Sequence, residues 1–202
     1  MAIVGGAEVS AHRLDEYLQA ARLAIDTRHV QIELDLTPGI ALAEAILADI
    51  DRNRDGSLSA EEQRAYGSSV LSALTLEVDG TPVRAQLGAT SFPDAQAIRR
   101  GEGTIGIQLA ATLPRLSMGP HQLLFRNSHH PDHSVYLANA LVPGSDQIAV
   151  TAQRRDDDQS ELIIDYVVRA APATSTAVWL LGSIAAATVL AALLMRASRS
   201  LG

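Results

Sequence analysis

The sequence predicts a mainly β protein, an antiparallel β-sandwich that carries an inserted helix–loop–helix and one C-terminal transmembrane helix. Three observations predict this fold. Short segments of alternating apolar and polar residues recur along most of the chain, as half-buried strands require. The alternation gives way to a helical period across residues 39–74, and residues 177–195 carry no charge.

The first strands are predicted near the N-terminus. Residues 30–36 alternate without a break, and residues 18–25 are expected to pair with them through the polar turn at residues 26–28. Apolar residues then recur at intervals of three and four over residues 39–50, which predicts a short amphipathic helix. A second helix is predicted over residues 60–74. The two helices together form an insertion between early strands.

The strand period returns after residue 74. Residues 74–78 are followed by Asp79-Gly80, which is typical of a type I′ turn, so a hairpin with residues from Val83 onward is expected. Five more strands are predicted at residues 104–111, 121–127, 135–141, 148–153 and 161–168. Strands at this spacing, separated by turn residues, favour an antiparallel sandwich.

Length and composition exclude several functions. The 202 residues leave room for one ordinary domain with appendages. The formal net charge is -7, and all basic residues are Arg, so nucleic acid is not an expected partner because it requires a basic surface. The absence of Cys excludes a disulfide framework, a thiolate metal site and a cysteine nucleophile.

The C-terminal part predicts a single-pass membrane protein. Residues 177–195 form an uncharged apolar run that, at about 1.5 Å per residue, just spans a hydrocarbon core of about 30 Å. A buried core helix is the competing interpretation. Arg196 and Arg199 follow the run and predict that residues 196–202 are a cytoplasmic tail. Residues 12–170 are then an extracytoplasmic domain, periplasmic or at the cell surface, and residues 171–176 a linker.

This orientation requires an export signal. Residues 1–11 are too short for a secretory peptide and lack its basic start, but Val9-Ser10-Ala11 looks like the small-residue end of one. We therefore expect residues 1–11 to be the remnant of an export signal, with a mature chain that begins near His12.

Residues 51–62 have the spacing of a calcium-binding loop. Asp51, Asn53 and Asp55 alternate so that three side-chain oxygens can converge, and Gly56 permits the sharp turn that follows. The remaining predicted ligands are the carbonyl of Ser57, the side chain of Ser59, acting directly or through water, and both carboxylate oxygens of Glu62. A shell of about seven oxygens favours Ca²⁺ over Mg²⁺. An acidic, solvated turn is the competing interpretation.

These residues and the flanking helical patterns resemble the EF-hand family across residues 39–74. The resemblance implies a helix–loop–helix that binds one calcium ion. EF-hands usually occur in pairs, whereas this sequence has one, so a calmodulin-like opening is not expected. Three carboxylates with Arg52 and Arg54 nearby predict weak binding, on the order of 10⁻⁵ to 10⁻³ M, and a structural ion rather than a switch.

A histidine cluster offers a second metal-binding candidate. His129, His130 and His133 carry imidazoles, which suit zinc, nickel or copper. A polar loop between two strands explains the same residues without an ion. No nucleophile elbow or phosphate-binding glycine loop is apparent, so an enzyme is not expected.

Residues 12–19 and 135–141 also resemble, faintly, exported membrane-anchored bacterial proteins of unassigned role, some of which look like outer domains of metal-transport proteins. The sequence therefore predicts calcium-stabilised binding or adhesion at the outer membrane face. The alternative is an accessory or metal-delivering subunit of a membrane transporter, which would add a membrane-protein partner to calcium and the bilayer.

Overall fold

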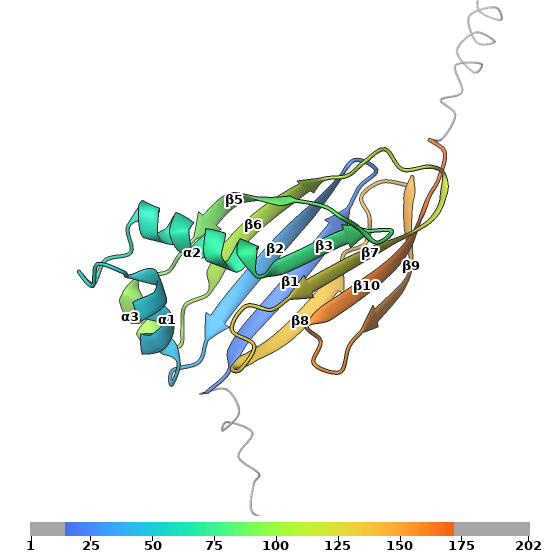
Figure 1. Cartoon of the computed structure of the whole chain (residues 1–202). Coiled ribbons are helices and arrows are strands. Elements are labelled where there is room, and N and C mark those ends of the chain that lie inside the picture. The colour runs from blue at the N-terminus through green and yellow to red at the C-terminus, as the bar shows by residue number, and fades with distance from the viewer. Residues whose placement is uncertain (1–14, 172–202) are drawn as a thin grey trace, which may run out of the picture. The chain divides into compact units, whose positions relative to one another are not determined.

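Two five-stranded sheets pack over one hydrophobic core (Figure 1). The computed structural model describes residues 15–171. One sheet has the strand order β5-β6-β2-β1-β8, formed by Ala85–Ser91, Ile105–Thr112, His29–Pro38, Tyr17–Ile25 and Ser134–Ala140. The other has the order β4-β3-β7-β10-β9, formed by Thr81–Pro82, Leu74–Val78, Gly119–Asn127, Glu161–Val168 and Ile148–Arg155. The mainly β prediction is confirmed, and the two sheets fit the predicted sandwich.

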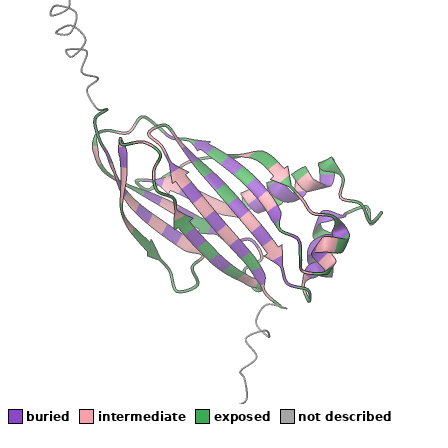
Figure 2. Ribbon diagram, turned by 180° about the vertical axis from the view of Figure 1, so that it is seen from behind, coloured by how far each residue is buried: buried purple, intermediate pink, exposed green. Residues whose placement is uncertain are grey.

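Alternation of burial along the strands explains why these segments form sheets. Every second residue of β1 is buried, from Tyr17 to Ile25, and β10 buries Leu162, Ile164 and Tyr166 in the same way. Figure 2 shows this as bands of buried residues that alternate with more exposed ones along the strands. Because both sheets contribute to the same cluster of buried side chains, the core lies between them.

The predicted N-terminal hairpin is confirmed. β1 pairs antiparallel with β2, from Tyr17 opposite Pro38 to Ile25 opposite Val30, and the backbone N–H of Asp26 closes the turn by donating to His29. The Asp79-Gly80 turn is also present, with φ of 50° and 74°.

Two strand pairings differ from the prediction. β1 and β8 lie parallel, with Tyr17 opposite Ser134, so the first sheet is not purely antiparallel. The predicted hairpin after Val78 is short, because β4 contains only Thr81–Pro82. The chain then crosses to the other sheet, where β5 pairs with β6.

Three helices lie at one end of the sheets (Figure 1). α1 (Ala43–Ile50) and α2 (Ala60–Ser72) form the predicted insertion between β2 and β3, although α1 begins at Ala43 rather than at residue 39. α3 (Ala95–Arg99) was not predicted; the side chain of Asp94 caps it by accepting from the backbone N–H of Ala97 at 2.7 Å.

Several predicted segments lie outside the described residues: 1–11, 172–176 of the linker, 177–195 and 196–202. Among the helices that the structure does describe, none has the length and apolar character needed to cross a membrane.

Candidate metal centre

The loop between α1 and α2 holds five of the six predicted calcium ligands, and the sixth, Glu62, lies in the first turn of α2. α1 ends at Ile50, whose side chain is fully buried, so the loop starts from a fixed point. α2 begins in a capping box: the Ser59 hydroxyl accepts from the backbone N–H of Glu62, and the Glu62 carboxylate accepts from the backbone N–H of Ser59. Packing of Leu58 against the core fixes the second half of the loop.

Asp51 organises the first half of the loop. Its carboxylate is almost buried and accepts hydrogen bonds from the backbone N–H of Asp55 at 3.2 Å and of Gly56 at 2.9 Å. Such a turn requires a left-handed backbone, which Gly56 adopts with φ of 82° and Arg54 with φ of 60°. The glycine does so at no steric cost, so the sequence explains the turn at this position.

Glu62 reaches back from the other end of the loop. Its carboxylate accepts from the backbone N–H of Asn53 at 3.3 Å and from the hydroxyl of Ser59 at 2.7 Å. These hydrogen bonds, foremost those from Ser59, hold the pKa of Glu62 below its ordinary value. Glu62 is therefore an anion at neutral pH and is held in position.

The middle of the loop is tied together by its own polar groups. The Asn53 amide donates to the Asp55 carboxylate at 2.8 Å, and the backbone N–H of Ser57 donates to the same carboxylate at 2.8 Å. Five of the predicted ligands thus contribute side-chain oxygens to one network, while Ser57 contributes only its backbone. The groups are the hard oxygen donors that calcium prefers.

The carboxylates do not form a closed shell as they stand. Within residues 15–171, no three His, Asp or Glu side chains converge as a metal-binding group. The donor chemistry fits calcium, but Asp51, Asp55 and Glu62 accept hydrogen bonds from loop N–H groups instead of sharing one centre. Calcium binding would require these side chains to turn toward a common point.

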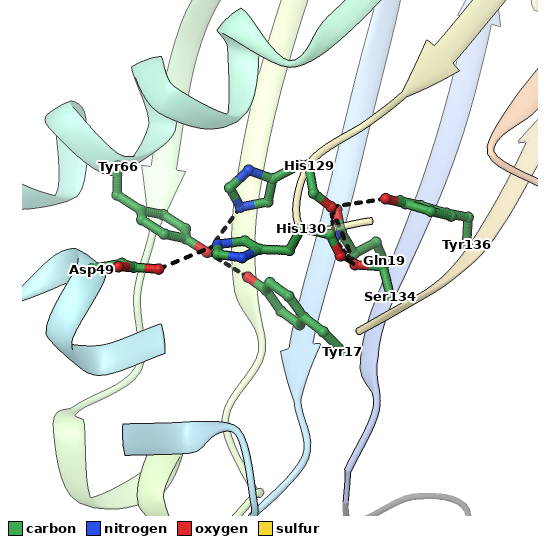
Figure 3. A network of polar contacts seen from close by, with 8 residues as sticks. All are labelled: Tyr17, Gln19, Asp49, Tyr66, His129, His130, Ser134 and Tyr136. Atoms are coloured by element: carbon green, nitrogen blue, oxygen red, sulfur yellow. Dashed lines mark hydrogen bonds and ion pairs between the residues drawn. The ribbon is translucent and has the colours of Figure 1, made fainter. Parts of the chain in front are cut away.

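A polar network, buried at Tyr66 and His129 and exposed at Asp49, fastens both helices to the sheets (Figure 3). The hydroxyl of Tyr66, on α2, lies 2.7 Å from the hydroxyl of Tyr17, on β1, and 3.2 Å from Nε2 of His129. Asp49, on α1, pairs with Nε2 of His130 at 3.3 Å. Each helix is therefore held by one of two adjacent histidines, which follow β7.

The histidine loop is itself held by buried amides. Gln19 donates to the carbonyl of His129 at 2.7 Å, and Asn127 donates to Gln19 at 2.9 Å. Asn127 also accepts from the backbone N–H of His129, and the hydroxyl of Tyr136 donates to the carbonyl of the same residue. Because these polar groups are buried and mutually satisfied, they specify one position of the loop.

Hydrogen counting assigns the tautomer of His129. Burial, together with the neighbouring His130, lowers the pKa of His129 to about 4, so its ring is neutral at pH 7. Every hydroxyl hydrogen has an acceptor if Tyr17 donates to Tyr66 and Tyr66 donates to Nε2 of His129. The proton of His129 then resides on Nδ1. Burial also raises the pKa of Tyr66 above its ordinary value, so its hydroxyl stays protonated as a donor.

The three histidines predicted as metal ligands have different environments. His129 is buried, His130 is half-buried, and His133 is exposed. The first two serve the network, and no three-ligand group includes them among the described residues. Tyr17, Gln19 and Asp49 were not singled out from the sequence. The signal for Gln19 was present, since it is a polar residue at an inward-facing position of an alternating strand.

A polar pocket of about 430 Å³ lies beside the network. Its lining comes from the end of α1, one side of α2 and the histidine loop, and includes Asp49, Arg52, Tyr66, Ser69, His129 and His130. Arg52 belongs to the calcium-type loop, so the pocket and the loop share a wall.

The chain matches no protein-family model and no curated protein. Function must therefore be inferred from the loop, the network and the pocket.

Proposed function

We propose that residues 51–62 bind one calcium ion, as a single EF-hand loop in a membrane-anchored extracytoplasmic domain. The ligands are Asp51, Asn53, Asp55, Ser57, Ser59 and Glu62. The observation that carries the proposal is that Asp51 and Glu62, at opposite ends of the loop, both turn their carboxylates inward onto loop N–H groups. Inward carboxylates on a tight glycine turn are what an oxygen-ligated calcium site requires.

The ion supports a fixed structure rather than opening the helix pair. Opening would separate α1 from α2 and break the contacts of Tyr66 with His129 and of Asp49 with His130. It would also remove Leu58 from the core. Leaving the buried Tyr66 and His129 without partners would cost about 1–3 kcal/mol per group, whereas the partly exposed Asp49–His130 pair adds little, so the closed arrangement is favoured.

A fixed helix pair gives the ion a role in binding. The pocket of about 430 Å³ is walled by both helices, so an ion that holds the loop also holds the pocket. Calcium-supported binding or adhesion at the outer membrane face follows, with residues 177–195 as the anchor. The predicted affinity, on the order of 10⁻⁵ to 10⁻³ M, suits a site filled outside the cytoplasm.

Calcium titration of the full chain in detergent, by isothermal calorimetry, tests the proposal. Glu62→Gln removes one ligand charge and should weaken binding by at least about tenfold, equivalent to about 1.4 kcal/mol. The matched control is Glu61→Gln, because Glu61 is exposed, adjacent and not a predicted ligand. Unchanged binding in Glu62→Gln would show that the loop is not the site.

A second candidate function is an accessory subunit of a membrane transporter. The observation that favours it is an apolar strip on the outer face of β1 and the edge strand β8, where Leu18, Val135 and Leu137 are each 36–40% exposed. Calcium-dependent co-purification with a polytopic protein, lost in Leu137→Asp, would support this role. A melting temperature that depends on calcium, with no such partner recovered, would support the first candidate function, calcium-supported binding or adhesion.

A further inference from the structure

The end of the sheets opposite the helices forms one continuous surface. It consists of the turn at residues 26–29, the loops at residues 113–118 and 141–147, and residues 169–170, and is called the distal surface below. The carbonyl of Arg28 accepts from Leu113 at 2.8 Å, and the backbone N–H of Arg169 donates to Gln147 at 2.7 Å. Figure 1 shows these segments together at the end where the described chain stops.

Large apolar side chains project from the distal surface. Val142 is 92% exposed and Met118 is 71% exposed, more than any other large apolar residue within residues 15–171. Leu141, beside Val142, is also exposed. They lie on two different loops, each of which connects one sheet to the other, residues 113–118 from β6 to β7 and residues 141–147 from β8 to β9.

Arginines flank these apolar tips. Arg28, Arg115 and Arg169 are exposed, and their guanidinium groups make no hydrogen bond or ion pair with other residues of the described part. In contrast, Arg22 and Arg99, elsewhere on the surface, are paired with carboxylates.

Fewer carboxylates than arginines lie within these segments. The carboxylates are Asp26 and Asp146, and Asp79 lies nearby, where it pairs with His121 at 2.7 Å while His121 contacts the carbonyl of Ser117. Three arginines against two carboxylates leave these segments slightly positive, on a chain whose formal net charge is -7.

The chain leaves the described part at this surface. Residues 170–176 separate Arg169 from the predicted membrane span and could reach at most about 25 Å when fully extended. A span at residues 177–195 would therefore keep the distal surface close to the headgroups. This inference rests on the proposed membrane anchor.

We propose that the distal surface docks on an anionic lipid bilayer. Met118 and Val142 insert among the headgroups, and Arg28, Arg115 and Arg169 bind lipid phosphates. Two apolar side chains and three arginines would bind a bilayer only weakly on their own. The anchor holds the domain beside the bilayer and so raises the effective concentration of the distal surface at the headgroups. Docking fixes the orientation of the domain and directs the helices and their pocket away from the membrane.

Single-cysteine labelling of the full chain tests the docking, because the sequence contains no Cys. Val142→Cys and Met118→Cys each carry a polarity-sensitive fluorophore in phosphatidylcholine vesicles with or without phosphatidylglycerol. Ser68→Cys, an exposed serine on α2, is the matched control at the opposite end. Spin-labelled lipid should quench labels 142 and 118 at least about twofold more than label 68, and most strongly in anionic vesicles.

A triple variant checks the charge contribution. Replacing Arg28, Arg115 and Arg169 by Gln should lower the quenching in anionic vesicles to the level seen in phosphatidylcholine. Vesicle flotation reports the anchor separately. A chain that floats but shows equal quenching at all three positions overturns the docking and leaves the anchor standing. Cross-linking of residue 142 to a second copy of the chain, in place of quenching by lipid, would also overturn the docking. A chain that does not float with the vesicles would overturn both the anchor and the docking.

Discussion

The sheets and the helix end of this domain share apolar packing but differ in how much buried hydrogen bonding adds to it. Between the sheets, Leu34, Ile164 and Phe125 are buried among other apolar side chains, and burial of apolar area stabilises that region. At the helix end, Ile50 and Val70 join the same core, and a buried hydrogen bond between Tyr66 and His129 is added to this packing. Apolar packing tolerates changes in pH and ions, whereas a polar network depends on both. The helix end is thus the part of the domain in which a bound ion can matter.

The largest expected effect lies in the apolar region. Phe125→Ala should lower the free energy of unfolding by about 3–5 kcal/mol, because it leaves a cavity between the sheets. Urea unfolding with and without calcium measures the change. The loss should be the same in both conditions if the two regions are independent. A loss that shrinks greatly in calcium would show that the ion supports the whole core.

The same division explains how far the sequence could predict the structure. Local patterns were sufficient for β1, β2 and the Asp79-Gly80 turn, since alternation and turn chemistry act within a few residues. The strand expected from Val83 onward forms as β5, but it pairs with β6 in the other sheet instead of completing a hairpin with β3. The parallel pairing of β1 with β8 joins segments more than one hundred residues apart, and no local signal encodes it.

The candidate site was predictable only in part, for the same reason. The loop ligands lie within twelve consecutive positions, so their spacing is visible in the sequence. The network joins Tyr17, Tyr66 and His129 from three distant segments, and tertiary structure alone brings them together. His129 and His130 were predicted as metal ligands because the spacing of histidines in the sequence gives no sign that one of them, His129, contacts a tyrosine in the fold.

The next effect in size is a pH dependence of the helix end. The pKa of His129 is lowered to about 4 in the folded protein, while an unfolded histidine titrates near about 6.5. As pH falls through this window the unfolded state binds the proton first, so folding stability decreases. The ring of His130 and the side chains of Tyr17 and Tyr66 contact this ring, and Asp49 lies beyond His130, with which it pairs.

Urea unfolding between about pH 6.5 and pH 5 measures the effect. The expected loss of stability is about 2 kcal/mol, since a full pH unit in this window corresponds to about 1.4 kcal/mol. His129→Gln should flatten the dependence. His121 acts in the opposite direction: burial lowers its pKa, but hydrogen bonds to Asp79 and Ser117 outweigh burial and raise it. The stability that His121 contributes to the folded state is retained at acidic pH and is lost as pH rises through its folded pKa. An equal slope in wild type and His129→Gln would contradict the assignment.

The smallest effect separates the two regions most cleanly, because a buried tyrosine hydroxyl can be removed from each, at Tyr66 on α2 and at Tyr166 on β10. Tyr66→Phe deletes the oxygen that joins Tyr17 and His129, and should cost about 1–2 kcal/mol of stability by leaving buried polar groups unpaired. Tyr166→Phe deletes a buried hydroxyl that has no hydrogen-bond partner within the described residues, so it should be neutral or slightly stabilising. Thermal unfolding of the two variants, Tyr66→Phe and Tyr166→Phe, measures the difference in stability. Calcium titration of Tyr66→Phe should also show weaker binding, because Tyr66 holds α2 and α2 carries Glu62. Equal losses in both variants would mean that the hydroxyl network does not hold the helix end, and that packing of the tyrosine rings is sufficient in both regions.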